Sequence, residues 1–144
     1  MGKRRRAREL AVQVQFHLEY SPGDPGKAFD LICGTFAAGK SIRDFSKQLV
    51  VGAAEKKKEI EQLISRASRN WRLDRMSRVD RCILRLAVYE MAFVDDVPPR
   101  VSIDEAVELG KRFGSEDSAG FINGVLDNIY NTLVREGRIE DEVS

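Results

Sequence analysis

The stretch Ser77–Phe93, SRVDRCILRLAVYEMAF, decides the fold of this chain. At 100° per residue it predicts a helix with two separate apolar stripes. One stripe contains Val79, Cys82, Ile83, Leu86 and Phe93, and the other contains Leu84, Val88 and Met91. A helix that is apolar on two sides packs against neighbours on both, so we expect this helix to be central. Ser77 followed three residues later by Asp80 has the form of a capping box and marks the helix start.

Helical periodicity also precedes this central stretch. We expect a first helix with an inward stripe from Ala7 to Leu18, ended by the turn sequence SPGDPG at residues 21–26. A short helix over about 27–36 follows. The period then runs unbroken from Phe45 to Ala67, which predicts one long third helix.

Helical signals continue after the central stretch as well. A loop at 95–100 leads to a second capping box, Ser102–Glu105, which is expected to open a helix that Gly114 ends in C′ fashion. A last helix is expected from about Ser118, with Gly137 as its stop.

No segment alternates as a β-strand does, so the expected class is all-α: a compact six- to seven-helix fold made of two packed helical bundles. We expect one domain over residues 1–144. Its N-terminal helical half spans about 4–70 and its C-terminal half about 71–137, divided near Trp71, with an acidic tail at 138–144.

The formal net charge of +1 hides an asymmetry along the 144 residues. Residues 1–9 hold five basic side chains against Glu9, whereas the remainder holds 19 basic and 22 acidic ones. A basic end on a mildly acidic body indicates a localised anionic partner. Cys33 and Cys82 lie in apolar patterns without metal-ligand spacing, so we expect buried, reduced thiols and neither a metal nor another cofactor. No apolar run fits a signal peptide or a membrane span, which predicts a cytoplasmic protein with no membrane partner.

The sequence offers no catalytic residues, and we expect no enzyme. No triad can be assembled around the single histidine, His17, and without strands there is no Gly-rich nucleotide-binding loop. The adjacent pairs Asp95-Asp96 and Asp104-Glu105 are interpreted as structural charge, because neighbours on a helix point to different sides. Glu90 falls within the inward stripe of the central helix, where a basic or backbone donor should meet it; a functional acid is the alternative.

Phe16 lies about 180° from the centre of the inward stripe of the first helix, on the same side as Arg5. Arginines neutralise phosphates, and unpaired RNA bases stack on aromatic rings and guanidinium planes. This combination favours single-stranded RNA over duplex DNA, for which a recognition helix would be needed. Two other interpretations stay open: Phe16 packs against another helix, or the basic run is a solubilising, disordered arm.

A second candidate surface lies at residues 111–118, KRFGSEDS, where one helix ends and another begins. Backbone N–H groups near Ser118 can bind an anion there, and Phe121 and Asn123 flank the inward stripe of the last helix. An ordinary helix–loop–helix joint is the alternative.

Four blocks stand in order along the chain: RRRARELAVQ (4–13) with Phe16–Glu19, VDRCILRLAVYEM (79–91), VPPRVSIDEAVELGKRFG (97–114) and EDSAGFINGVLDNI (116–129). They resemble, in the same order, the motifs of the NusB family of transcription antitermination factors. The resemblance runs from Arg4 to about Ile129 and implies an all-helical fold of two bundles. It also implies a function: binding the boxA element of nascent ribosomal RNA leaders together with NusE, a small-subunit ribosomal protein. The RNA polymerase antitermination complex then resists termination.

The resemblance, carried over by matching motif, also implies site residues. With the adjoining Lys3, the RNA contacts are expected at Arg4, Arg5, Arg6, Arg8, Gln13, Lys111, Arg112, Phe113, Asp117, Ser118, Phe121 and Asn123. The NusE-facing surface is expected at Phe16, Asp80, Leu84 and Arg85. The family thus assigns Phe16 to the protein partner rather than to RNA.

Three positions depart from the family pattern. Phe16 stands where Tyr is usual, so a hydrogen bond from that hydroxyl is lost. Gly110 replaces a usual Ala, which costs helix propensity of up to about 1 kcal/mol. Ile122 replaces a usual Val, a mild change in core volume.

Two other readings of the chain compete with antitermination. A related helical domain precedes the catalytic domain of a ribosomal RNA cytosine methyltransferase, but that reading needs an α/β domain which these 144 residues lack. The second is a helical scaffold or homodimeric interaction module that buries the Phe16 face against a copy of itself.

Overall fold

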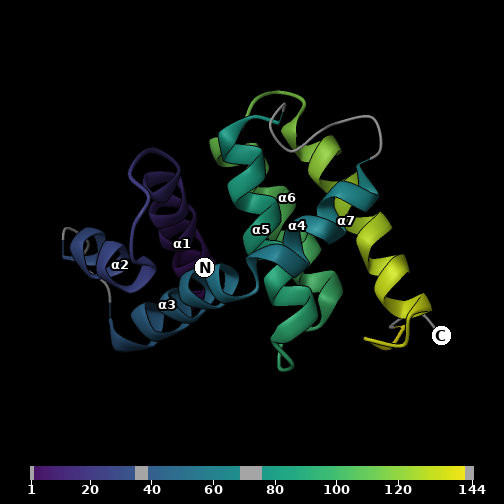
Figure 1. Ribbon diagram of the computed structural model, residues 1–144, viewed down its shortest axis with the longest axis horizontal. Helices are drawn as coiled ribbons and strands as arrows, with labels where there is room; N and C mark the ends of the chain where they lie inside the picture. Colours follow the sequence, from purple (N-terminus) through teal and green to yellow (C-terminus); the bar gives the residue numbers. More distant parts are fainter. Residues whose placement is uncertain (1, 35–38, 69–75, 142–144) are drawn as a thin grey trace.

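The computed structural model describes residues 2–34, 39–68 and 76–141. Within these ranges it contains seven α-helices and no strand, which confirms the all-α prediction (Figure 1). The helices are α1 (Lys3–Tyr20), α2 (Pro25–Cys33), α3 (Lys40–Glu55), α4 (Lys57–Ala67), α5 (Arg78–Phe93), α6 (Pro99–Phe113) and α7 (Ser118–Arg135). The expected joint at Trp71 and the last residues of the tail lie outside the described residues.

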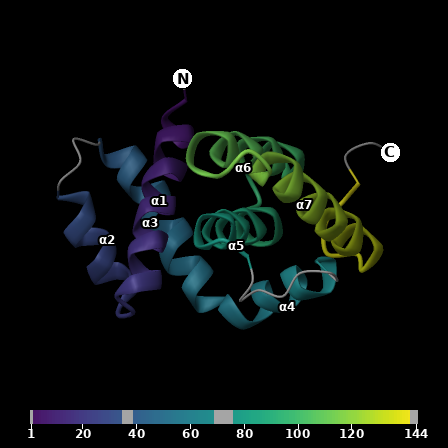
Figure 2. The same cartoon turned by 90° about the horizontal axis from the view of Figure 1, so that it is seen from above.

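Helix α5 is the central helix, as its two apolar stripes predict. It contacts α1 and α3 on one side and α6 and α7 on the other, with α4 below it in Figure 2. Ile83, Leu84 and Val88 are almost completely buried. The Ser77 hydroxyl accepts a hydrogen bond from the Asp80 backbone N–H at 3.1 Å, which confirms the predicted cap.

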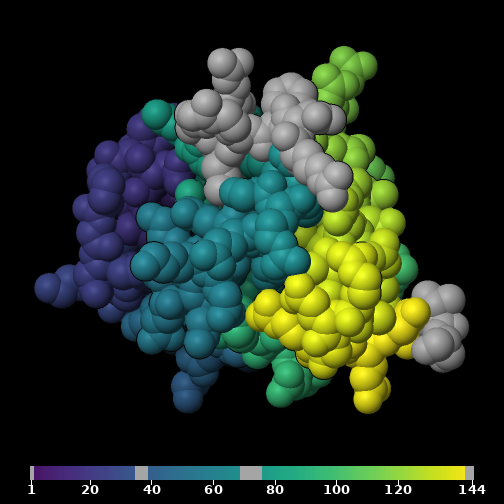
Figure 3. Space-filling view, turned by 45° about the vertical axis from the view of Figure 1, so that its right-hand side comes forward, coloured from purple at the N-terminus to yellow at the C-terminus, as the bar shows by residue number. Residues whose placement is uncertain are grey.

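The predicted long third helix is wrong: the chain bends at Lys56, between α3 and α4. Backbone hydrogen bonds Lys56 N–Gly52 O and Ile60 N–Lys56 O run through the bend at 3.0 Å each, so the phase of the apolar pattern survives it. The exposed run EKKKE at the bend offers no packing that would keep the helix straight. α4 therefore turns away to pack on α5 and α7, and Figure 3 shows it beside the C-terminal half of α7.

The start of α6 also differs from the prediction. The helix begins at Pro99, with Pro98 as its N-cap, and not at Ser102. A proline at the first helical position has its φ already set for the helix and has no N–H that needs a partner, so it outweighs the capping box downstream. Ser102 instead lies inside the helix, buried, and its hydroxyl has no hydrogen-bond partner in the described part of the chain.

Two glycines mark the ends of α6 and α7 for different reasons. Gly114 caps α6 with φ −93°, so the predicted left-handed C′ conformation is wrong there. A Cβ at this position would instead overlap the Ser118 side chain, which explains the glycine. Gly137 does have φ +71°, and the bonds Gly137 N–Val134 O (3.0 Å) and Arg138 N–Leu133 O (2.9 Å) form a Schellman motif that confirms the predicted stop.

Gly110 and Ile122, the two core positions where a departure from the family pattern is expected, fit against each other. A Cβ built on Gly110 would lie 2.9 Å from the Cδ1 atom of Ile122, which is the methyl group that a valine lacks. The extra methyl on α7 thus fills the space that the missing methyl on α6 leaves open. The pair keeps α6 and α7 closely packed at this point.

Both cysteines are buried free thiols, as predicted. Burial raises the pKa of the Cys82 thiol to about 12, with a smaller contribution in the same direction from the nearby Glu19 carboxylate. No helix in the described ranges is long and apolar enough to cross a membrane.

Candidate nucleic-acid interface

The basic run forms the first turn of α1 and is not a disordered arm. Lys3, Arg4 and Arg6 are exposed, while Arg5 is half-buried. The N-terminal end of a helix carries partial positive charge, so four cations in its first turn are unfavourable in isolation. This turn therefore needs anions from elsewhere, either from the protein or from a ligand.

The Arg8–Glu90 pair anchors α1 to the central helix. The Arg8 Nε donates to both Glu90 carboxylate oxygens at 2.8 and 3.1 Å, and Nη2 lies 2.6 Å from Oε1. Both side chains are under a tenth exposed. This confirms that Glu90 is buried and that a basic donor meets it. The same burial removes Arg8 from the surface, so in this conformation it has no access to RNA.

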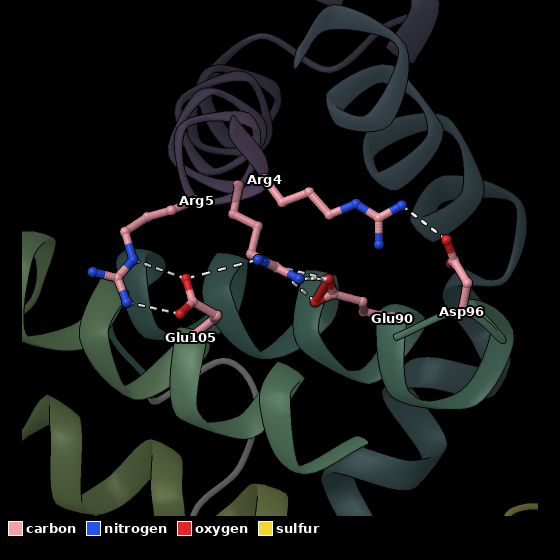
Figure 4. Close-up of polar contacts among 6 residues, drawn as sticks. Arg4, Arg5, Glu90, Asp96 and Glu105 are labelled. Atoms are coloured by element: carbon pink, nitrogen blue, oxygen red, sulfur yellow. Dashed lines mark hydrogen bonds and ion pairs between the residues drawn. The ribbon is translucent and has the colours of Figure 1, made fainter. Parts of the chain in front are cut away.

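Two further arginines of the same turn are held by carboxylates from distant parts of the chain (Figure 4). Arg5 binds Glu105 of α6 through Nε at 3.0 Å and Nη2 at 2.8 Å. Arg4 binds Asp96 of the α5–α6 loop at 2.8 Å, and its guanidinium lies 4.3 Å from the centre of the Phe45 ring. The hydrogen bonds from these arginines lower the pKa values of the Glu105 and Asp96 carboxyl groups.

A hollow of about 240 Å³ brings the two predicted RNA segments together between α1 and α6. Arg5 reaches it from the start of α1, and Lys111 and Arg112 reach it from the end of α6. The other lining residues are Glu9, Glu105, Glu108 and Leu109. Residues about 100 positions apart in sequence therefore face one polar space.

The remaining residues predicted for RNA lie outside this hollow. Gln13, Phe113 and Phe121 are half-buried, and Asp117 and Asn123 are exposed. Ser118 is buried, and its hydroxyl accepts the Ser115 backbone N–H at 2.9 Å. That bond fixes the loop between α6 and α7 and leaves Ser118 as part of the joint.

The residues predicted to face the protein partner lie around the contact of α1 with α5. Phe16 is half-buried and packs edge-on against the exposed Tyr20 at 5.1 Å between ring centres. Asp80 is buried, and its Oδ1 has no hydrogen-bond partner among the residues described. Arg85 bridges Glu19 and Glu61. Leu84 is fully buried, so its side chain offers no contact to a partner in this conformation.

A cluster of ion pairs, in which Arg81 and Arg85 of α5 bind Glu19 of α1, joins these two helices. Burial by itself raises the pKa of Glu19, but hydrogen bonds from Arg81 and Arg85 outweigh that effect and lower it.

Val12 is also buried although it shares a side with Phe16, because α1 is covered by α2, α3 and α5. The half-buried state of Phe16 follows from the same enclosure.

Sequence reasoning missed the carboxylates that neutralise the basic turn. Asp96 and Glu105 stood out only as members of adjacent acidic pairs, and Phe45 only as a core residue. Their pairing with α1 depends on how distant helices pack. The one available signal was Glu90, a carboxylate on an apolar stripe that required a cation.

Comparison with known proteins places this geometry in a family. A family model described as the NusB family matches residues 5–131. The transcription antitermination protein NusB of Desulfatibacillum aliphaticivorans is 47% identical over 140 residues, which cover 97% of this chain and 98% of the relative. NusB from T. maritima has a solved structure with TM-score 0.83 and 38% identity, covering 89% of this chain and 90% of that one.

A solved structure of the antitermination factors NusB and NusE in complex with double-stranded RNA is also similar. Its matching chain has TM-score 0.83 and 29% identity, with 92% of this chain and 98% of that chain covered. Fold and site together define a compact all-helical protein that gathers cationic helix ends on one face. The chain belongs to the NusB family.

Proposed function

We propose that this protein is a transcription antitermination factor that binds a boxA-type single-stranded segment of a ribosomal RNA leader together with NusE. The RNA polymerase antitermination complex that carries it resists termination. The observation that carries the proposal is the hollow between α1 and α6, where Arg5 meets Lys111 and Arg112. Curated relatives named as antitermination proteins support it. The protein acts in the cytoplasm by binding and not by catalysis, as one unit over residues 1–144.

The RNA surface centres on the exposed cations of two helix ends. Lys3, Arg4 and Arg6 of α1 and Lys111 and Arg112 of α6 are accessible to phosphates. Unpaired bases have aromatic neighbours in the half-buried rings of Phe113 and Phe121 for stacking, and Gln13, Asp117 and Asn123 supply polar contacts. Arg8 serves this surface indirectly, because its buried pair with Glu90 fixes the start of α1.

The NusE surface lies at the other end of α1. Phe16, with Tyr20 beside it, presents an aromatic edge. The buried Asp80 Oδ1, which has no hydrogen-bond partner in the described part of the chain, is an acceptor that a donor from the partner can satisfy. Arg85 adds a charge at the same place, while Leu84 supports the surface from the core. The proposed RNA surface and the proposed NusE surface therefore lie at opposite ends of α1.

The test is fluorescence anisotropy with a labelled boxA-like single strand, a scrambled strand and a duplex, each at several salt concentrations. About four phosphate contacts predict a slope of log affinity against log salt near −3 for a single strand. Replacing Arg4, Arg5 and Arg6 by Ala should lower the affinity and flatten the slope by about 2. The control replaces Lys56, Lys57 and Lys58 by Ala, which removes the same charge at the exposed α3–α4 bend. Equal losses in both variants would contradict the proposed surface.

A second outcome concerns the alternative function. If wild-type protein binds all three RNAs alike and NusE changes nothing, the proposal fails. Light scattering would then show whether the chain forms a homodimer through the Phe16 face, as the scaffold interpretation requires.

A further inference from the structure

Every cation that lines the hollow is already paired with a carboxylate of the same hollow. Arg5 binds Glu105 at 2.8 Å, Lys111 lies 3.1 Å from Glu108, and Arg112 lies 3.4 Å from Glu9. Three cations and three carboxylates therefore balance within one polar space. A surface built only to attract phosphate would not carry equal negative charge.

Two cations of the adjacent turn differ from those in the hollow. Lys3 and Arg6 are exposed, and within the described ranges neither forms an ion pair. They can attract an RNA strand without giving up an existing contact. Although Lys111 and Arg112 are exposed, each cation of the hollow binds a phosphate at the expense of an ion pair that it already forms.

We propose that Glu105, with Glu9 and Glu108, determines RNA specificity by making phosphate binding in this hollow an exchange for an existing ion pair. The inference rests on the proposed RNA-binding function and concerns how that site rejects other RNA.

The physical reason lies in where non-specific affinity comes from. Free cations gain affinity for any polyanion, because phosphate contacts release condensed counterions regardless of sequence. A cation that leaves a carboxylate to bind a phosphate gains only the difference between its interaction free energies with these two anions. An RNA that also makes base contacts can offset that cost, whereas one that offers phosphates alone cannot.

Glu105 is the decisive carboxylate of the three. It accepts two hydrogen bonds from Arg5 and lies 3.7 Å from Nη1 of Arg8, so it links Arg5 in the first turn of α1 to the buried Arg8 in the next turn. Arg8 keeps its own contacts with Glu90 if Glu105 loses its charge. The start of α1 should therefore stay anchored in a Glu105→Gln variant, whose amide oxygen still accepts one hydrogen bond.

The experiment measures anisotropy of the full-length Glu105→Gln protein with the boxA-like and the scrambled strand. We expect the scrambled strand to bind on the order of two- to five-fold more tightly, with a smaller gain for the boxA-like strand, so that the affinity ratio falls. For the scrambled strand the slope of log affinity against log salt should become more negative by about 0.7, as expected for one added phosphate contact on a single strand.

The matched control is Glu136→Gln. Arg66 binds Glu136 through Nη2 and Oε2 at 2.8 Å, the same atoms and distance as in Arg5–Glu105, but this pair joins α4 to the end of α7. The Glu136→Gln variant changes the net charge by the same amount as Glu105→Gln and should leave the affinities for both strands unchanged. Circular dichroism checks that each variant is folded. If the Glu105→Gln protein is not folded, the test is repeated with Glu108→Gln, which removes a carboxylate from the helix surface.

The results separate this inference from the proposed function. Unchanged affinities, or weaker binding of both strands by folded Glu105→Gln protein, would overturn the exchange mechanism. An equal gain in the control would reduce the effect to net charge and overturn it as well. Failure of the wild-type protein to prefer the boxA-like strand would instead refute the proposed function, while the change in salt slope still tests the exchange.

Discussion

Removal of the buried Glu90 carboxylate should be the most damaging single charge change in this protein. In a Glu90→Ala variant the Arg8 guanidinium loses contacts at 2.6, 2.8 and 3.1 Å, in a place where its side chain is 8% exposed. Breaking a buried pair by removing one partner costs about 3–5 kcal/mol, because the remaining charge is left without compensation. Glu105 lies 3.7 Å from Arg8 and offsets part of that cost. We therefore expect a loss near the lower limit, about 3 kcal/mol.

Urea unfolding followed by circular dichroism measures this loss. The midpoint should fall while the slope m stays the same, and the melting temperature should drop by roughly 10 °C for a chain of this size. The double variant Arg8→Met/Glu90→Leu replaces both charges by apolar groups and should lie within about 1 kcal/mol of the wild type or above it. Asp96→Ala, which breaks an exposed pair with Arg4, should have no measurable effect on stability.

Two results would refute the reasoning. A loss below about 1 kcal/mol for Glu90→Ala would mean that the pair is solvated and does not anchor α1. A double variant as unstable as the single one would mean that the loss comes from packing around Glu90 and not from an uncompensated Arg8 charge.

Three further predictions concern packing and reactivity. Gly110→Ala adds a methyl group that meets Cδ1 of Ile122, and Ile122→Val removes that Cδ1, so the double variant should be about 1 kcal/mol more stable in urea unfolding than the sum of the two single losses predicts; strict additivity would contradict the match. Gly52→Ala drives a methyl group into the half-buried ring of Tyr89 and should cost about 1–3 kcal/mol. Gly124→Ala, with nothing within 4 Å of the new Cβ, should stabilise α7. Equal effects of these two changes would refute the packing assignment. The Cys82 thiol, whose pKa burial raises to about 12, should resist iodoacetamide until urea unfolds the protein, and rapid labelling of folded protein would contradict its burial.

The parts of the fold that could be predicted depend on helical phase, that is, on the spacing of apolar and capping residues along a single helix. Two apolar stripes place α5 at the centre, and the position of Glu90 on one of them indicates a buried pair. Ser77 and Gly137 act through hydrogen bonds to residues within one helical turn, so their roles follow from the adjacent sequence. Signals of this kind need no knowledge of distant helices.

The parts that could not be predicted are a helix bend and a helix start, neither of which changes the spacing of the apolar residues. The bend at Lys56 keeps the helical hydrogen bonds in register, so the apolar pattern passes through it unchanged. Ser102 has the right neighbours for a cap, but the prolines before it start the helix a turn earlier.

Long-range pairing was equally hidden from the sequence. Glu105 meets Arg5 only because α6 packs beside α1, and no spacing rule connects positions 100 residues apart. The fit of Ile122 to Gly110 likewise emerges only when α6 and α7 are seen together. Taken alone, a glycine inside α6 looks unfavourable and an isoleucine in α7 looks neutral, and the contact between them supplies a reason for both.

The central claim is that one helix serves RNA at its start and a protein partner at its end. The most direct measurement is the affinity of this protein for a labelled boxA-like strand with and without saturating NusE, against the scrambled strand. We expect selective binding that weakens with salt and tightens when NusE is present, and a Phe16→Ala variant that loses only the gain from NusE. Binding that ignores both sequence and NusE would contradict the claim.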